Sequence, residues 1–219
     1  MMAEEIEKNA SKFGPRWQRK KEDRPQEILD AAVELFVQQG FAATKVSQIA
    51  RKAGVTPGTL YVYYKNKEAI LQEVVMKALS PIFYDADSIL NNYAGTAKDL
   101  VSILIEKWWN AVGGESKISG IPKLISAEAS NFPELSDFYK KNILTPAYNY
   151  IRLVLEYGIK TGEFQIENVN AVAYTILCAF HGAVLDAHSF KIAASNGVQV
   201  GLFKGMFHDL VLHGILKTK

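Results

Sequence analysis

Residues 45–67 constrain this chain more than any other stretch. They read KVSQIARKAGVTPGTLYVYYKNK and include no Asp or Glu. An apolar-faced segment ends at Gly54, and Thr56 then offers an N-cap with Pro57 at the first helical position. The pattern predicts a short helix over 45–53, a tight turn, and a second short helix that opens at Pro57.

Charge is distributed unevenly along the 219 residues, although the net charge is only +2. Residues 16–67 hold ten Lys and Arg against five Asp and Glu, a net charge of +5, whereas residues 68–219 carry thirteen against fifteen. A small basic module joined to a near-neutral larger one indicates that one part meets phosphate and the other does not.

The rest of the chain predicts an all-α fold, because apolar residues recur at spacings of three and four and no alternating strand pattern stands out. Pro25 suits the first turn of a helix that ends before Gly40, Thr44 is a candidate cap, and Pro146 is expected to kink or split a long helix. Helices are predicted at 25–39, at 45–53, from 57, from 67 after an Asn66 cap, and at 97–112, 119–130, 134–160, 168–190 and 197–215.

Several function classes are not expected. The single Cys178 excludes disulfides within one chain and is expected to be a buried thiol. The N-terminus is polar and no apolar run approaches the roughly 20 residues of a membrane span, so we expect a cytoplasmic protein with no membrane partner. His181, Asp186 and His188 lack the helical i, i+4 pair that favours a metal, and no catalytic pattern appears, so neither an enzyme nor a cofactor is expected.

The 45–67 stretch has the properties of a DNA-reading helix-turn-helix, which presents the start of its second helix to base edges. That start consists of short residues, so the backbone can approach the groove closely, and Tyr61 and Tyr63 can bond phosphates. The second helix has no Arg, Asn or Gln, so phosphate contacts should position the protein, with specificity from methyl contacts, Lys45, Ser47 and DNA shape.

Residues 25–79 resemble the N-terminal domain of TetR-type transcriptional regulators. The resemblance rests on Gly40-Phe41, Thr44, Ile49-Ala50, Ala53-Gly54-Val55, Gly58-Thr59-Leu60-Tyr61, Tyr63-Tyr64 and Lys65-Asn66-Lys67-Glu68. It implies an all-α homodimer with an N-terminal helix-turn-helix domain and a C-terminal helical ligand-binding and dimerisation domain. It covers about a quarter of the chain.

The resemblance, with the local pattern, assigns the DNA contacts. Position 62 departs from the family, which often has a larger polar or aromatic residue there, so no contact is assigned to Val62. The expected contact residues are Thr44, Lys45, Val46, Ser47, Thr56, Pro57, Gly58, Thr59, Tyr61, Tyr63 and Lys67.

The expected domains are a flexible basic arm over 1–24, a DNA-binding domain over 25–66, and a ligand-sensing and dimerisation domain over 67–219. The arm is either a solvated tail or a segment that lies on DNA. The helix that begins at Lys67 is expected to belong to both of the larger parts and to join them.

In this family the last two helices form the dimer, which here are 168–190 and 197–215. Gly197, Gly201 and Gly205 fall four apart, which favours close approach of another helix, either in the partner or in the same subunit. The candidate interface residues are Leu177, Phe180, Val184, Val200, Gly201, Phe203, Gly205, Phe207 and Val211.

Many aromatic residues lie between these regions; most should be ordinary core, and some should line a pocket if the chain is a sensor. Trp108 and Trp109 are adjacent and so point about 100° apart on a helix. The candidate pocket residues are Trp108, Trp109, Glu128, Phe132, Tyr148 and His181.

The sequence therefore predicts a homodimeric regulator, a repressor released from a palindromic double-stranded DNA operator by a small apolar or amphipathic effector. Effector binding should move the helix from Lys67 onward and so change the spacing of the two reading helices. The alternative is a helical adaptor that uses the same module for protein partners; DNA binding would instead weaken steeply with salt.

Overall fold

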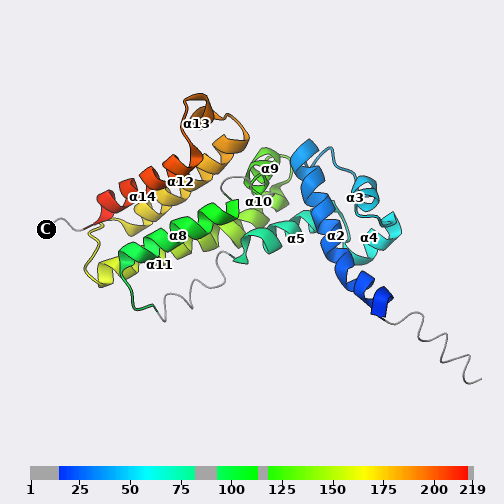
Figure 1. Ribbon diagram of the computed structural model, residues 1–219, viewed down its shortest axis with the longest axis horizontal. Helices are drawn as coiled ribbons and strands as arrows, with labels where there is room; N and C mark the ends of the chain where they lie inside the picture. Colours follow the sequence, from blue (N-terminus) through cyan, green and yellow to red (C-terminus); the bar gives the residue numbers. More distant parts are fainter. Residues whose placement is uncertain (1–14, 82–92, 113–117, 217–219) are drawn as a thin grey trace, which may run out of the picture. The chain divides into compact units, whose positions relative to one another are not determined.

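The computed structural model describes residues 15–81, 93–112 and 118–216, which are mostly helical (Figure 1). The exception to helices and turns among these residues is an isolated antiparallel bridge between Phe164 and Leu216. The chain divides into two compact units, the first ending at Leu71 and the second beginning at Gln72. The predicted all-α class is thereby confirmed, while the predicted domain division at residue 67 stays a prediction.

The first described helix is longer than expected. Helix α2 covers Pro15–Gln39 and contains Pro25, where we predicted the helix to begin. Residues 15–24, expected in a flexible arm, are therefore helical. Pro25 has no N–H to donate to the carbonyl four residues earlier. Because proline is therefore favoured in the first turn of a helix, we predicted the helix to begin there. The C-terminal part of α2 carries the buried face of the helix, with Ile28 and Phe36 almost fully buried.

The described residues of the smaller unit also form α3 (Val46–Lys52), α4 (Pro57–Tyr63) and the start of α5 (Lys67–Leu79). The predicted left-handed turn residues are confirmed, since Gly40 has φ of +84° and Gly54 of +67°. Asn66 caps α5 as expected, accepting a hydrogen bond from the Ala69 amide at 2.8 Å. Phe41 folds back on α2, as predicted, with its ring 5.3 Å from that of Phe36.

In the larger unit, the described residues form four long helices that run alongside one another (Figure 1). The predicted helix at 97–112 is confirmed to the residue, the last two helices are slightly shorter than predicted, and α13 was not anticipated. The long helices are α8 (Ala97–Val112), α11 (Thr145–Lys160), α12 (Val169–His188) and α14 (Val200–Ile215), and the short ones are α9 (Ile121–Glu128), α10 (Pro133–Tyr139) and α13 (Ile192–Ser195).

The predicted helix at 134–160 is divided. A π-helical turn, Lys140–Leu144, separates α10 from α11, and Pro146 lies in the first turn of α11. Because Pro146 cannot donate a backbone hydrogen bond, the chain widens by one residue before it: the Thr145 amide donates to the Lys140 carbonyl, five residues back. The expectation that Pro146 perturbs a long helix is confirmed.

A line of aromatic rings holds α14 against the rest of the larger unit. Centroids lie 5.2 Å apart for Trp108 and Phe180, 4.5 Å for Phe180 and Phe207, and 5.9 Å for Phe207 and Phe203. Trp109, on the neighbouring face of α8, meets Phe203 at 5.8 Å. The two tryptophans therefore diverge as predicted, one toward α12 and one toward α14.

Helix α12 departs from two expectations. It is long and apolar enough to cross a membrane by length and composition alone, with mean hydropathy 1.4, whereas we expected no such segment. The helix nonetheless buries one face, including Ala173 and Ile176, within the unit, and it contacts α9 and α11. Cys178 is exposed rather than buried, because it lies on the opposite face of this helix.

Candidate nucleic-acid interface

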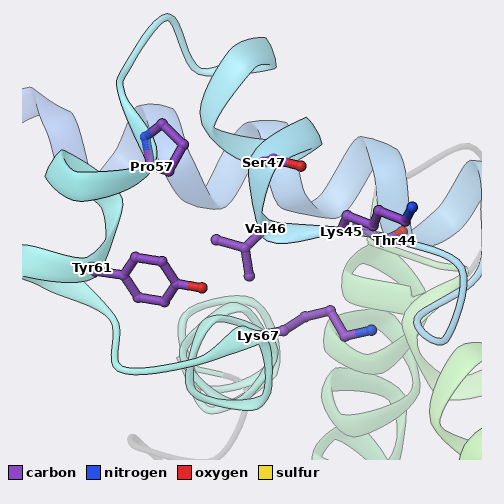
Figure 2. A pocket seen from close by; sticks show the side chains of 7 residues that line it. All are labelled: Thr44, Lys45, Val46, Ser47, Pro57, Tyr61 and Lys67. Atoms are coloured by element: carbon purple, nitrogen blue, oxygen red, sulfur yellow. The ribbon is translucent and has the colours of Figure 1, made fainter.

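The smaller unit has a hollow between the start of α3, the start of α4 and the start of α5 (Figure 2). In this view the Val46 and Tyr61 side chains point toward one another from α3 and α4. The lining contains no acidic residue, and all of its members are among the predicted DNA contacts. They are Thr44, Lys45, Val46, Ser47, Pro57, Tyr61 and Lys67.

The start of α3 is fixed differently from the predicted Thr44 cap. Lys45 is the N-cap residue, and its backbone amide donates to Gln48 Oε1 at 2.8 Å. Thr44 is only 2% exposed, and its hydroxyl donates back to the Gly40 carbonyl at 2.7 Å. The reason is that Gly40 turns the chain so sharply that the Thr44 side chain faces inward. Thr44 thus holds the turn, and a DNA contact from it stays a prediction.

Helix α4 begins as predicted, with Thr56 as its cap and Pro57 in the first turn. The Thr59 amide donates to Thr56 Oγ1 at 3.1 Å, and the two hydroxyl oxygens lie 2.9 Å apart. Leu60 is fully buried and anchors the helix. The Thr59 hydroxyl is therefore oriented by Thr56, while its outer edge remains accessible to a base or phosphate.

The side of α4 away from Leu60 carries little but apolar and aromatic surface. Tyr61 is 55% exposed and Val62 is 79% exposed. Tyr63 is half-buried, and across the hollow Lys45 and Ser47 are exposed. Hydroxyl and ammonium groups at these positions suit phosphate oxygens, which accept hydrogen bonds from Tyr, Ser and Lys.

Lys67 is half-buried and is bound within the chain. Its ammonium group donates to the Phe41 carbonyl at 2.6 Å and to the Ala42 carbonyl at 3.3 Å. It also lies 4.3 Å from the centre of the Phe41 ring, a cation–π distance. Lys67 therefore connects the start of α5 to the turn that precedes α3, a role that the sequence analysis did not foresee.

Four predicted contacts lie outside the lining of the hollow: Thr56, Gly58, Thr59 and Tyr63. They belong to α4 or cap it, so the structure keeps them within the same helix-turn-helix. Gln39 was not among the predicted site residues; its amide nitrogen donates to Gln48 Oε1 and to Thr44 Oγ1, at 3.2 and 3.1 Å. The spacing of Gln48, three residues after the cap, is the signal that could have found this network.

The predicted pocket residues are not all gathered at one place. Tyr148 donates to Asn170 Oδ1 at 2.9 Å, near the start of α12. His181 lies eleven residues further along the same helix, about 16 Å at 1.5 Å per residue. Glu128, the last residue of α9, is buried, and Phe132, immediately before α10, is half-buried. Their role in binding an effector stays a prediction.

His181 is the most unusual of these residues. Its Nε2 atom is buried with no hydrogen-bond partner among the residues that the structure describes, and its ring lies 6.3 Å from that of Tyr139. Burial lowers the pKa of His181 below its ordinary value and raises the pKa of Tyr139. A neutral imidazole at this position keeps one nitrogen available to a polar group that the described part of the chain does not supply.

Several predicted dimer residues are instead covered within the subunit. Leu177, Phe180, Val184 and Phe207 are each at most 9% exposed, and Phe203 stacks on Phe207. Gly197 has φ of +69° and precedes α14, so the three glycines do not form one stripe on that helix. For the aromatic residues, this burial favours the alternative of contacts inside the subunit. The sequence left both alternatives open because α12 and α14 are apolar on more than one face.

Different residues of the same two helices are exposed. Leu202, Met206 and Leu210, four residues apart along α14, are 58%, 50% and 72% exposed. On α12, Tyr174 is 63% exposed and Cys178 is exposed beside it. We call the first three residues the α14 stripe. Val211 is half-buried, Gly205 lies beside the stripe, and the exposure of Val200 and Gly201 is outside what the structure describes.

Comparisons with known proteins identify the fold and the family. A sequence profile described as "Bacterial regulatory proteins, tetR family" matches residues 28–74, which include α3, α4 and most of α5. The fatty acid metabolism regulator protein of Bacillus subtilis (strain 168) is 32% identical over 148 residues, which cover 66% of this chain and 74% of that protein.

Two solved structures share the fold along nearly the whole chain. The fatty acid degradation regulator FadR from Bacillus halodurans superposes with a TM-score of 0.72 at 24% identity, covering 87% of this chain and 95% of that one. FadR from Bacillus subtilis, solved in complex with stearoyl-CoA, gives a TM-score of 0.69 at 25% identity, covering 86% and 98%.

The resemblance stated from the sequence is therefore confirmed. The relatives are transcriptional regulators, and the helix-turn-helix that the profile matches is the part of this chain whose hollow is basic and free of carboxylates. The chain belongs to the TetR family of bacterial regulatory proteins and is a DNA-binding transcriptional regulator.

Proposed function

We propose that the chain is a repressor that binds a palindromic operator as a homodimer and places α4 in the major groove. One observation carries this proposal: residues from α3, α4 and α5, all predicted to contact DNA, line one hollow that contains no carboxylate. Lys45, Ser47 and Tyr61 would bond phosphates on the two sides of the groove. Phosphate contacts position such a protein, and groove contacts supply the specificity.

The experiment measures binding to the DNA upstream of the protein's own gene by fluorescence anisotropy at several salt concentrations. Affinity should fall steeply as salt rises, and Tyr61→Ala should weaken it at least tenfold, because that substitution removes a phosphate contact of about 1.5–3 kcal/mol. Phe190→Ala, at a 78% exposed position in the larger unit, is the matched control and should leave affinity unchanged. Salt-independent binding to a protein partner, with no DNA affinity, would favour the adaptor alternative.

For the effector, we propose a long-chain acyl thioester. This proposal is supported by similarity. The Bacillus subtilis relative is a fatty acid metabolism regulator, and the structure of FadR from Bacillus subtilis was solved in complex with stearoyl-CoA. Among the described residues, His181 Nε2 is a buried polar atom without a hydrogen-bond partner, and its ring lies beside that of Tyr139. An apolar chain with one polar linkage would match an apolar pocket that has few polar groups.

Thermal shift with three ligands separates the parts of this effector. Stearoyl-CoA should raise Tm and release the operator, whereas coenzyme A alone should do neither and stearate should act more weakly. His181→Phe should reduce the shift from stearoyl-CoA while leaving operator binding without ligand intact. Equal shifts for all three ligands, or none, would exclude the acyl thioester while leaving the DNA-binding proposal untouched.

For the dimer, we propose that the α14 stripe and the exposed face of α12 meet their copies in the partner across a two-fold axis. Three large apolar side chains in a row on one helix suit another helix, because side chains four residues apart form a ridge that enters a groove. Cys178 provides a native reporter: maleimide labelling should slow as protein concentration rises through the dimer dissociation constant. A labelling rate independent of concentration would place Cys178 outside the interface.

The coupling between effector and DNA is proposed to run through α5. This helix begins at Lys67 in the smaller unit and ends at Leu79 in the larger one. Because Lys67 is bound to the Phe41 and Ala42 carbonyls, a displacement of α5 would also displace the turn before α3. Effector and operator must then weaken each other's binding by the same factor.

Cellular location follows from the family rather than from the structure. Regulators of this family are soluble DNA-binding proteins, and we propose that this chain acts in the cytoplasm. Among the described helices, α12 is long and apolar enough to cross a membrane, so it provides the check on this location. Fractionation should recover the chain in the soluble fraction, and recovery in the membrane pellet would contradict this.

A further inference from the structure

Val62 is the most exposed large apolar side chain among the described residues, at 79%. It lies near the end of α4, the helix proposed above to enter the major groove. The family resemblance assigns no role to Val62, because the residue departs from the usual pattern. An exposed valine on a seven-residue helix contributes little to folding, so folding does not explain why an apolar side chain lies on this surface.

The turn of the helix places Val62 on the outermost row of α4. Each residue advances about 100°, so Val62 lies on the side opposite Leu60, which is fully buried. Gly58 is four residues earlier and shares the row, and it too is exposed. Tyr61 and Thr59 flank the row on its two sides. Gly58 and Val62 are therefore the parts of α4 that reach furthest from the core.

Gly58 is not required by the fold. A Cβ added there would meet only Thr56 Oγ1, at 3.8 Å, an ordinary contact distance, and its φ is not in the left-handed region. Alanine would also be the better helix former by about 1 kcal/mol. The missing side chain instead leaves the first turn of α4 bare, so that the helix can approach a partner closely enough for Val62, one turn later, to touch it.

The chemistry of the row indicates what it touches. Helix α4 reads PGTLYVY and has no carboxylate, amide or guanidinium group that could pair with a base edge. The outermost group is a pair of methyls on Val62. The C5-methyl of thymine is the apolar group that the major groove presents. We propose that Val62 reads this methyl and makes the operator specific for thymine at one position in each half-site.

The test uses the full-length protein and duplexes that it selects from a random library, so it needs no prior operator. Each thymine of the selected half-site is replaced in turn by uracil, which keeps the base pair and removes only the methyl group. One position should cost wild-type protein about fourfold in affinity per half-site, the effect of one buried carbon. Val62→Ala should bind the thymine duplex more weakly and lose no further affinity on uracil.

Two further variants keep the result interpretable. Val37→Ala makes the same change at a 44% exposed position on α2 and should retain the wild-type uracil pattern. Gly58→Ala should weaken binding to all duplexes about equally while the thermal stability of the free protein holds or rises. Circular dichroism of each variant confirms that the fold is kept.

The outcomes separate this inference from the function on which it rests. If wild-type protein selects no duplex, the DNA-binding proposal fails and Val62 has nothing to read. If it selects duplexes but uracil costs nothing at any position, the reading of a thymine methyl is overturned. The same holds if Val62→Ala keeps the full uracil sensitivity, since another residue would then contact the methyl.

Discussion

Both compact units expose apolar side chains, but in different arrangements. The smaller unit exposes Tyr61 and Val62 on a seven-residue helix beside a hollow lined without carboxylates. The larger unit exposes the α14 stripe along a sixteen-residue helix. A short patch among hydroxyl and ammonium groups suits a groove that is apolar only at its thymine methyls. A long continuous ridge suits another helix.

The largest test of this comparison is Met206→Glu, at the centre of the α14 stripe. A carboxylate there would be buried without a partner in the dimer, so we expect monomers by light scattering. Operator affinity should then fall more than about a hundredfold, because each chain binds one half-site without its linked copy. Ile159→Glu, at a 39% exposed position of α11, is the control and should remain dimeric. A dimeric Met206→Glu protein would place the interface elsewhere.

The next test asks whether the smaller unit depends on Lys67. Lys67→Ala removes two hydrogen bonds from a charged donor and a cation–π contact with Phe41. We expect a loss of about 2–3 kcal/mol in the free energy of unfolding, measured with urea. Lys65→Ala removes an equal charge from an exposed position and should cost less than about 0.5 kcal/mol. Equal effects of the two would mean that Lys67 acts through charge alone.

Two helical glycines in the larger unit give a smaller, signed contrast. A Cβ on Gly158 would lie 2.0 Å from the Phe164 ring, whereas one on Gly205 would meet nothing within 4 Å. Gly158→Ala should lower stability by about 1–3 kcal/mol through overpacking. Gly205→Ala should raise the stability of a monomeric background such as Met206→Glu by up to about 1 kcal/mol. Destabilisation by Gly205→Ala in the dimer but not in the monomer would show that a partner helix closes on it.

The two units also differ in how much of them the sequence predicts. In the smaller unit the turns depend on local chemistry, so Gly40, Gly54, Thr56 and Asn66 were all placed correctly. Thr44 was not, because its inward direction depends on the turn at Gly40 rather than on its own neighbours.

In the larger unit the long helices were predicted but their faces were not. Phe180 and Phe207 were candidates for the dimer interface, with packing inside the subunit as the alternative, and they contact each other, while Cys178 was expected inside and is exposed. Periodicity identifies an apolar face only when the opposite face is polar, and α12 and α14 are apolar on both. Which face is covered depends on the rings of α8, which lie about seventy or more residues away in sequence.

The smallest expected effect is a pH dependence confined to the larger unit, which contains all four histidines. Burial lowers the pKa of His181, and burial with nearby Lys123 and Lys191 lowers that of His188. Below the ordinary histidine pKa of about 6.5, the unfolded chain therefore binds more protons than the folded chain, so stability is complete above that pH and declines as pH falls below it. His181→Gln should make this decline in Tm shallower, whereas His213→Gln, at an exposed position, should not. A steeper decline for His181→Gln would mean that the protonated ring finds a partner in the folded chain.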